Sequence, residues 1–137
     1  MARNLIQVLV LLAAASWAQV GPSQAVVVTA TYFHGDFRCP SCLKLERWSK
    51  VAIQTGLADS IGTGRLAWQT RNMDTPEGSA LADRFGLASK ALVLVETRGG
   101  RMSRFKELKE TWRNLRDSTA FARYVKSETI AFLEAAR

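Results

Sequence analysis

The sequence predicts an α/β domain in which a central mixed sheet of about four strands carries helices on both faces. Runs of β-branched and aromatic residues alternate along the chain with segments whose apolar residues recur every three or four positions. The 137 residues, of which 47% are hydrophobic and 23% charged, are enough for one core of ordinary globular composition. We therefore expect a single domain over residues 26–137.

Residues 1–25 differ in character from the rest of the chain. Arg3 is their only charge, and an apolar block runs from Leu5 to Ala18, shorter than the roughly 20 residues that span a bilayer. A positive start, a block of this length and small residues at Ser23 and Ala25, or at Ser16 and Ala18, are typical of a cleaved secretory signal peptide. An uncleaved anchor or a buried helix is the alternative. Cleavage would give a periplasmic or secreted protein without a stable membrane span.

The chain is basic, with a formal net charge of +7. From Arg98 to Arg123 the basic residues are interspersed with acidic ones, which is typical of a solvated surface rather than of a nucleic-acid stripe. We therefore expect no nucleic-acid partner. The charge leaves open an acidic partner or a membrane surface.

The first predicted strand, Val26–Phe33, has no charge and is rich in β-branched and aromatic residues, as in a strand buried on both faces. It ends at a turn-like stretch, residues 34–36. A helix is predicted from Pro40 to about Thr55, because apolar residues recur there at helical spacing (Leu45, Trp48, Val51 and Ala52). Proline suits the first helical turn, so Cys39 falls at or next to the N-cap.

The middle of the chain predicts a glycine-containing loop (Gly56, Gly62 and Gly64), a second strand and another helix. The strand covers residues 65–72. We expect Thr75 to cap the helix, Pro76 to lie in its first turn and Gly86 to end it. The predicted inner face of this helix consists of Ala80, Leu81 and Phe85.

The last third predicts a hairpin and a long helix. Gly99-Gly100 joins strand Ala91–Val95 to residues 101–105, so these strands should be antiparallel neighbours. Leu108, Trp112 and Leu115 fit either a short helix or an ordered loop. The final helix, near residues 119–136, is capped by Asp117 or Ser118 and buries one apolar stripe: Phe121, Val125, Phe132 and Leu133.

The resulting order, β-α-β-α-β-β-α, is that of the thioredoxin fold, with both cysteines at the carboxyl end of the first strand. A helix N-terminus offers free amide donors and a partial positive charge, which favour a thiolate at Cys39. Cys42 returns to the same side of the first turn. We therefore interpret Cys39 as the nucleophile and Cys42 as the resolving thiol, with supporting positions at His34, Arg38 and Pro40.

Each supporting residue also has a less specific interpretation. His34 fits a strand-end residue whose ring is satisfied by backbone hydrogen bonds, and Arg38 fits a solvated charge. The four large aromatic residues Trp48, Trp68, Phe85 and Trp112 are interpreted as core.

A metal site is the main chemical alternative. Two cysteines and one histidine fall short of the four ligands of a structural zinc site, but Cys39, Cys42 and His34 would make a three-ligand site, or the two thiolates a copper(I) site. We predict no bound metal. No flavin or nicotinamide motif is present, so no cofactor is expected.

The stretch Tyr32-Phe-His-Gly-Asp-Phe-Arg-Cys-Pro-Ser-Cys42 resembles the ArsF family of exported, thioredoxin-like bacterial proteins. The resemblance continues through Arg71–Asp74, Phe85–Leu87, Ala91–Val95 and residues 112–125. It implies a thioredoxin fold with a redox-active cysteine pair outside the cytosol.

The chain departs from the thioredoxin pattern at two places. The proline that normally precedes the third strand is missing, since residues 88–91 read Ala-Ser-Lys-Ala. Val26–Phe33 also holds no carboxylate, so deprotonation of Cys42 would need water or another group. A proline directly after the first cysteine resembles glutaredoxins and stronger oxidants of the superfamily more than thioredoxin. This resemblance implies a better oxidant than thioredoxin.

The sequence thus predicts an exported thiol-disulfide oxidoreductase or electron carrier acting on a protein partner. Two alternatives stay open: a thiolate metal-binding module, and an interaction domain whose disulfide stays closed.

Overall fold

The structure, a computed structural model, describes residues 25–136, so the predicted signal peptide lies almost wholly outside the described residues. Within these residues, four strands, four α-helices and two 3-10 turns follow one another. Their bounds are β1 Val26–His34, α1 Pro40–Gln54, α2 Ala58–Gly62, β2 Leu66–Asn72, α3 Pro76–Arg84, β3 Ala91–Arg98, β4 Arg101–Glu107, η1 Lys109–Thr111, η2 Arg113–Arg116 and α4 Ser118–Ala135.

The four strands form one mixed sheet in the order β2-β1-β3-β4. β1 pairs parallel with β2 and antiparallel with β3, and β3 pairs antiparallel with β4. Parallel pairing of β1 and β2 across α1, followed by a hairpin, is the arrangement that the predicted element order requires. The thioredoxin-like fold predicted from the sequence is therefore confirmed.

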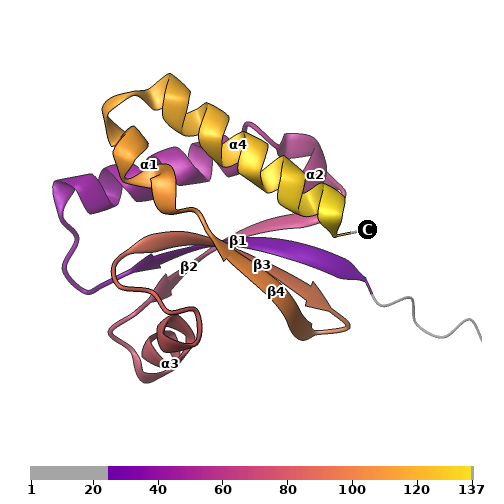
Figure 1. The fold of residues 1–137 in the computed structure, drawn as a ribbon, viewed down its shortest axis with the longest axis horizontal. Coiled ribbons are helices and arrows are strands. Elements are labelled where there is room, and N and C mark those ends of the chain that lie inside the picture. The colour runs from indigo at the N-terminus through magenta and orange to yellow at the C-terminus, as the bar shows by residue number, and fades with distance from the viewer. Residues whose placement is uncertain (1–24, 137) are drawn as a thin grey trace, which may run out of the picture.

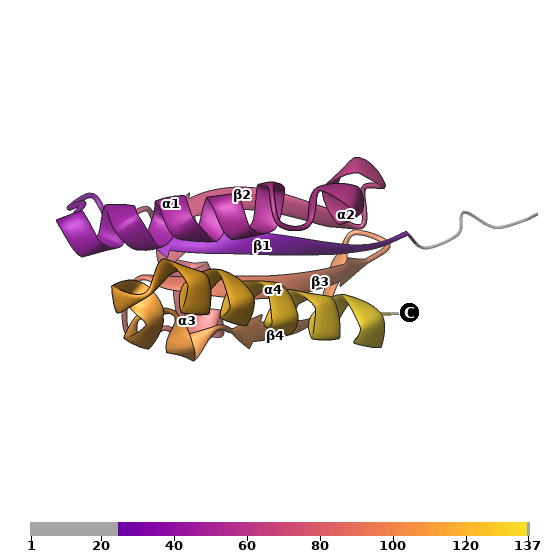
Figure 2. The same cartoon turned by 90° about the horizontal axis from the view of Figure 1, so that it is seen from above.

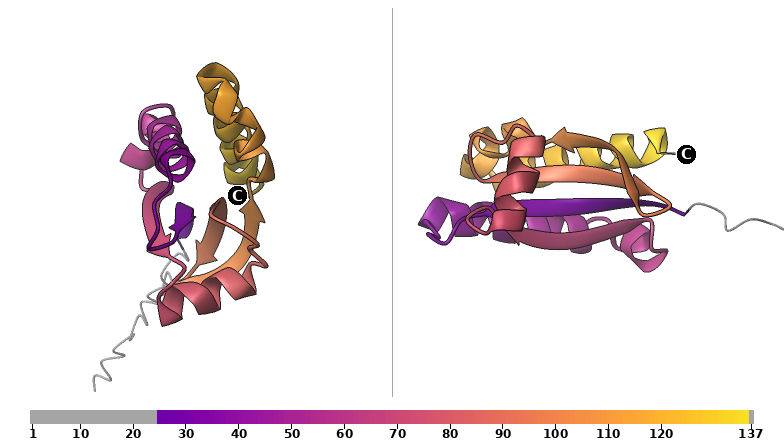
Figure 3. Two further views of the ribbon diagram at one scale, coloured as in Figure 1. Left: turned by 90° about the vertical axis from the view of Figure 1, so that its left-hand side faces the viewer. Right: turned by 90° about the horizontal axis from the view of Figure 1, so that it is seen from below.

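Helices cover both faces of the sheet, unequally (Figure 1). Helices α1, α2 and α4 lie on one face and α3 on the other, as the end-on view shows (Figure 3, left). Seen from above, α1 and α4 run side by side over the sheet (Figure 2). Within residues 25–136, no helix has the length and apolar character needed to cross a bilayer.

Each face of the sheet has its own apolar core, because side chains alternate along β1. Val28, Ala30 and Tyr32 point into the larger core beneath α1 and α4, whereas Phe33 points into a smaller core beneath α3. All four are at most 1% exposed. Strand β1 is thus buried on both faces, as predicted, and its carboxyl end is held rigidly.

The helix ends and the hairpin turn follow the sequence signals. The Thr75 hydroxyl accepts from Gly78 N, and the Asp117 carboxylate accepts from the amides of residues 119 and 120. Gly99 and Gly100 both adopt positive φ, 54° and 77°, which a tight hairpin turn of this kind requires.

Three predictions about helices were wrong. Residues 58–62, predicted as loop, form the short helix α2. This helix has no N-cap signal in the sequence, because the N-cap residue Leu57 makes no side-chain hydrogen bond. Val51 is 55% exposed, since the buried face of α1 is centred on Leu45, Ser49 and Ile53 instead. Ala80 is exposed because α3 packs through Gly78 and Ala82.

Ser49 is buried on α1, and its hydroxyl has no hydrogen-bond partner. A buried polar group without a partner costs about 1–3 kcal/mol. We expect Ser49→Ala to stabilise the protein by about 1 kcal/mol, measured as a higher urea midpoint at unchanged slope. Ser127→Ala, which alters an exposed serine on α4, is the matched control and should leave the midpoint nearly unchanged. A destabilised Ser49→Ala variant would contradict this assignment.

At the far end of the sheet from the cysteines, β3 buries a carboxylate. Glu96 is 1% exposed, and its oxygens accept hydrogen bonds from Arg98 (2.7 Å), Ser103 (2.6 Å) and Arg104 (2.5 Å). Burial alone raises the pKa of Glu96, but these bonds outweigh it and lower the pKa to about 2. Arg104 also donates to the Phe132 carbonyl at 2.5 Å. The cluster therefore ties the hairpin to the end of α4.

Candidate functional site: a disulfide at a helix N-terminus

Cys39 and Cys42 form a disulfide in the first turn of α1, with their Cα atoms 4.9 Å apart. Cys39 is the N-cap residue, with extended backbone, and its sulfur accepts a hydrogen bond from Cys42 N at 3.0 Å. Pro40 occupies the first helical position, as predicted. The geometry therefore places the Cys39 sulfur where a helix N-terminus stabilises negative charge.

The two cysteines differ in access to solvent. Cys39 is partly exposed, whereas Cys42 is 3% exposed. The first turn of α1 contains no acidic residue that would oppose a thiolate. Cys39 is thus the more accessible of the two residues. The roles of Cys39 as nucleophile and Cys42 as resolving thiol stay a prediction.

The loop that leads into Cys39 is anchored to the end of β2. Asp36 N donates to the Asp74 carboxylate, and the Asn72 side chain donates to the Asp36 carboxylate, both at 2.6 Å. Gly35 is buried, and a Cβ there would come within 2.9 Å of an Asp74 carboxylate oxygen. Glycine at this position lets the loop approach Asp74 closely, which fixes the path of the chain just before the disulfide.

Beneath the disulfide, the Tyr32 hydroxyl donates to the Cys42 carbonyl at 2.9 Å in a fully buried bond. Burial, and next the charge of Glu46, raise the pKa of Tyr32 to about 12, while Arg38 acts in the opposite sense. Glu46 follows Cys42 by one helical turn and forms an ion pair with Arg38. The Glu46 carboxylate therefore acts on Tyr32, the residue whose hydroxyl holds the Cys42 carbonyl.

The supporting residues predicted from the sequence occupy distinct positions. His34 ends β1, and its Nδ1 lies 3.1 Å from the Gly35 carbonyl, which suits the backbone-bonded interpretation. Arg38 is partly buried in its ion pair with Glu46 rather than free in solvent. Tyr32 and Glu46 were missed. The signals were a tyrosine in a strand without charged residues, whose hydroxyl needs a partner once buried, and a glutamate four residues after Cys42.

We expect Tyr32→Phe to destabilise the protein by about 1 kcal/mol at neutral pH through loss of one buried hydrogen bond. In the unfolded chain the tyrosine pKa is about 10, so the folded state disfavours ionisation and loses stability as pH rises from about 10 to about 12. The Tyr32→Phe variant lacks this loss, so the difference in unfolding free energy between the unaltered protein and the variant should shrink over that pH range. Urea unfolding at pH 7 and pH 11 measures it, and a constant difference would contradict the assignment.

Trp112, predicted as core, is instead 38% exposed. Its ring nitrogen donates at 2.9 Å to the carbonyl of Lys90, in the loop that normally carries the proline before the third strand. Register pairs Ala91 with Phe33, so this loop lies at the same end of the sheet as the disulfide. Trp48 and Trp68 are partly buried against the larger core and Phe85 is buried, as predicted.

No group of three or more histidine, cysteine, aspartate or glutamate side chains within residues 25–136 is arranged to hold a metal ion. Cys39, Cys42 and His34 are thus not assembled as a three-ligand site. Both sulfurs are engaged in the disulfide. A reduced pair would still offer two thiolates to a soft metal.

Comparison with known proteins gives one similar solved structure. No family model matches the chain, and no curated protein matches it. Among solved structures, the chain is similar to a thioredoxin from Thermus thermophilus, with 20% identity over 70% of this chain and 76% of that chain, at a TM-score of 0.39. The assignment rests on the strand order and directions themselves. Fold and site together define a thioredoxin-like domain that carries a CXXC disulfide at a helix N-terminus.

Proposed function

We propose that this protein is an exported thiol-disulfide oxidoreductase or electron carrier that exchanges electrons with a protein partner. The observation that carries the proposal is the asymmetric disulfide: a partly exposed Cys39 at the N-cap of α1 and a buried Cys42 one turn later. The apolar segment before residue 26, the resemblance to the ArsF family and the persistence of disulfides outside the cytosol support the export part.

The chemistry is a two-electron exchange. A partner thiolate attacks the Cys39 sulfur, the Cys39–Cys42 bond breaks, and Cys42 leaves as a thiolate that takes up a proton. A second partner thiol, once deprotonated, attacks the mixed disulfide and releases Cys39 as a thiolate. The partner gains a disulfide, and this protein gains two thiols. The reverse sequence reduces a partner disulfide.

During these steps the helix N-terminus stabilises the Cys39 thiolate as leaving group or nucleophile. The Tyr32 hydroxyl holds the Cys42 carbonyl, and the anchored loop before Cys39 holds the other side of the turn. The sulfurs thus stay close enough to close and open the ring with little backbone movement.

Trapping tests the proposal. In cells, Cys42→Ser should accumulate a mixed disulfide with the partner through Cys39, because the resolving thiol is missing. The matched Cys39→Ser variant should trap none. An adduct that dithiothreitol dissolves, and whose partner cysteine mass spectrometry locates, is the expected result. Equal adducts with both variants, or none with either, would contradict it.

Export is tested separately. Cell fractionation should find the protein outside the cytoplasm, and the intact mass should correspond to a chain that begins at Val26, or at Gln19 if the earlier small-residue site is used. A cytoplasmic protein that retains residues 1–25 would contradict this part and leave the disulfide chemistry to be judged by trapping.

A further inference from the structure

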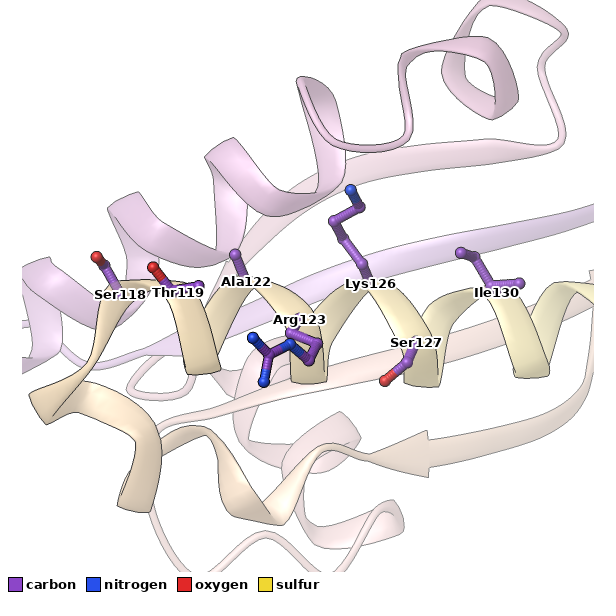
Figure 4. Close-up of a pocket in the computed structure, with 7 residues that line it drawn as sticks. All are labelled: Ser118, Thr119, Ala122, Arg123, Lys126, Ser127 and Ile130. Carbon is purple, nitrogen blue, oxygen red and sulfur yellow. The ribbon is translucent and has the colours of Figure 1, made fainter.

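Along the seam between α1 and α4 the surface is hollowed. One hollow of about 340 Å³ is lined by both helices, including Trp48 and Val51, and a second of about 610 Å³ follows α4. The two share Ser118 and Ala122 and so adjoin, and together they are here called the helix furrow. Figure 4 shows Ser118, Ala122, Lys126 and Ile130 along the side of α4 that faces α1.

The floor of the furrow is apolar and open to solvent. Val51 is 55% and Ile130 is 42% exposed, and both lie in these hollows. Trp48 packs edge-on against Phe121, so the floor continues into the core. Trp48 and Val51 line the first hollow and Ile130 lines the second, so each hollow offers an apolar side chain to an occupant.

The charges around the furrow are mostly of one sign. Arg47, Arg123 and Lys126 line it, and Lys44 lies over the Trp48 ring, 4.5 Å from its centroid. Within residues 25–136 none of these four forms an ion pair. Asp59 lies beyond Ile130, at the far end of the groove. An occupant with negative charge is therefore favoured.

The shape distinguishes between anionic occupants. From Ser118 to Ile130 the furrow follows thirteen residues of α4, a rise of about 18 Å at about 1.5 Å per residue, which matches three turns of a partner helix. Two adjoining hollows along this length fit a chain segment better than a flat bilayer surface. Two copies of this basic face would repel each other.

We propose that the helix furrow docks an acidic amphipathic helix of a protein partner, with apolar residues against Val51 and Ile130 and carboxylates against Arg47, Arg123 and Lys126. This is the helix-in-groove mode of recognition. The furrow begins at Arg47, two helical turns after Cys39, so it is a surface additional to the disulfide. The inference does not require the disulfide to be redox-active.

The test uses the full chain and a fluorescein-labelled helical peptide of about 14 residues, with leucines at i, i+3, i+4 and i+7 and glutamates elsewhere. Anisotropy should report saturable binding that weakens as salt rises from about 50 to about 500 mM. Arg123→Glu/Lys126→Glu should weaken binding at least about tenfold. The matched control Arg71→Glu/Arg101→Glu changes the net charge equally, on the edge strands β2 and β4, and should change binding less than about twofold.

An apolar pair of variants completes the test. Val51→Ser/Ile130→Ser should weaken peptide binding several-fold, whereas Leu43→Ser, which removes an exposed apolar residue of α1 outside the furrow, should not. Circular dichroism confirms that each variant folds. The rate of disulfide reduction by dithiothreitol should be the same in all variants, so a failed docking result stays separate from a failed redox proposal.

Absence of binding, or equal loss with both charge-reversal pairs, would overturn the proposal. So would tighter binding to phosphatidylglycerol vesicles that the furrow variants abolish, because the occupant would then be a bilayer. Sedimentation showing dimers that the furrow variants dissociate would assign the face to a second copy of this chain.

Discussion

Replacing Cys39 with serine is expected to reduce thiol-disulfide exchange to the background rate. The change removes the sulfur that a partner can reach, and leaves only Cys42, which is 3% exposed. The fold should survive, because closing so short a ring contributes little to stability and serine is a good N-cap residue that can accept the Cys42 amide hydrogen. The assay is reduction of the purified protein by dithiothreitol and its exchange with a model protein disulfide, with urea unfolding alongside.

The matched variant Cys42→Ser separates the two sulfurs. Its remaining Cys39 should react with a disulfide reagent much faster than Cys42 does in Cys39→Ser, with an apparent thiol pKa below the usual ~8.5. Similar rates in the two variants would remove the basis for assigning a nucleophile. If Cys39→Ser lowered the free energy of unfolding by several kcal/mol, the disulfide would be a structural bond instead.

Replacing Glu96 with glutamine is expected to produce the largest loss of stability, about 2–4 kcal/mol at pH 7. Glu96 is buried, and Arg98, Ser103 and Arg104 all direct donors at its carboxylate. An amide loses the charge and turns one acceptor oxygen into a donor, which opposes the arginines. Urea unfolding at pH 7 measures the loss. Glu107→Gln, on the neighbouring strand β4, is the matched control and should cost much less.

The same substitution should change the pH dependence. The pKa of Glu96 is about 2 in the folded protein and near 4.5 in the unfolded chain, so the unfolded state binds the proton first as pH falls. The stabilisation is therefore complete above about pH 4.5 and is lost between about pH 4.5 and pH 2. Glu96→Gln should lack this step. An unchanged acid profile would show that other carboxylates control acid unfolding.

The parts of the fold that could be predicted depend on local signals. Val26–Phe33 lacks any charge because both of its faces are buried, and Gly99-Gly100 supplies two positive φ angles where the hairpin needs them. The position of Cys39 at an N-cap follows from Pro40. These local signals are enough to place both cysteines at the start of α1.

The parts that could not be predicted depend on contacts between distant elements. The rotation of α1 about its axis is set by the sheet and α4, so Val51 faces the furrow while Ser49 is buried. The bond from Tyr32 to the Cys42 carbonyl crosses from β1 to α1. Trp112 is 38% exposed, and its ring nitrogen bonds to the carbonyl of Lys90, 22 residues earlier in the chain. Residue spacing within one element carries no information about such partners.

The reduction potential of the Cys39–Cys42 pair tests the central claim most directly. Equilibration of the purified protein with defined ratios of reduced and oxidised glutathione, with metal content determined on the same sample, gives the value. We predict a potential between about −270 and −120 mV without bound metal, as in redox-active members of the thioredoxin superfamily. A potential below about −300 mV, or stoichiometric metal held by both thiolates, would contradict the account.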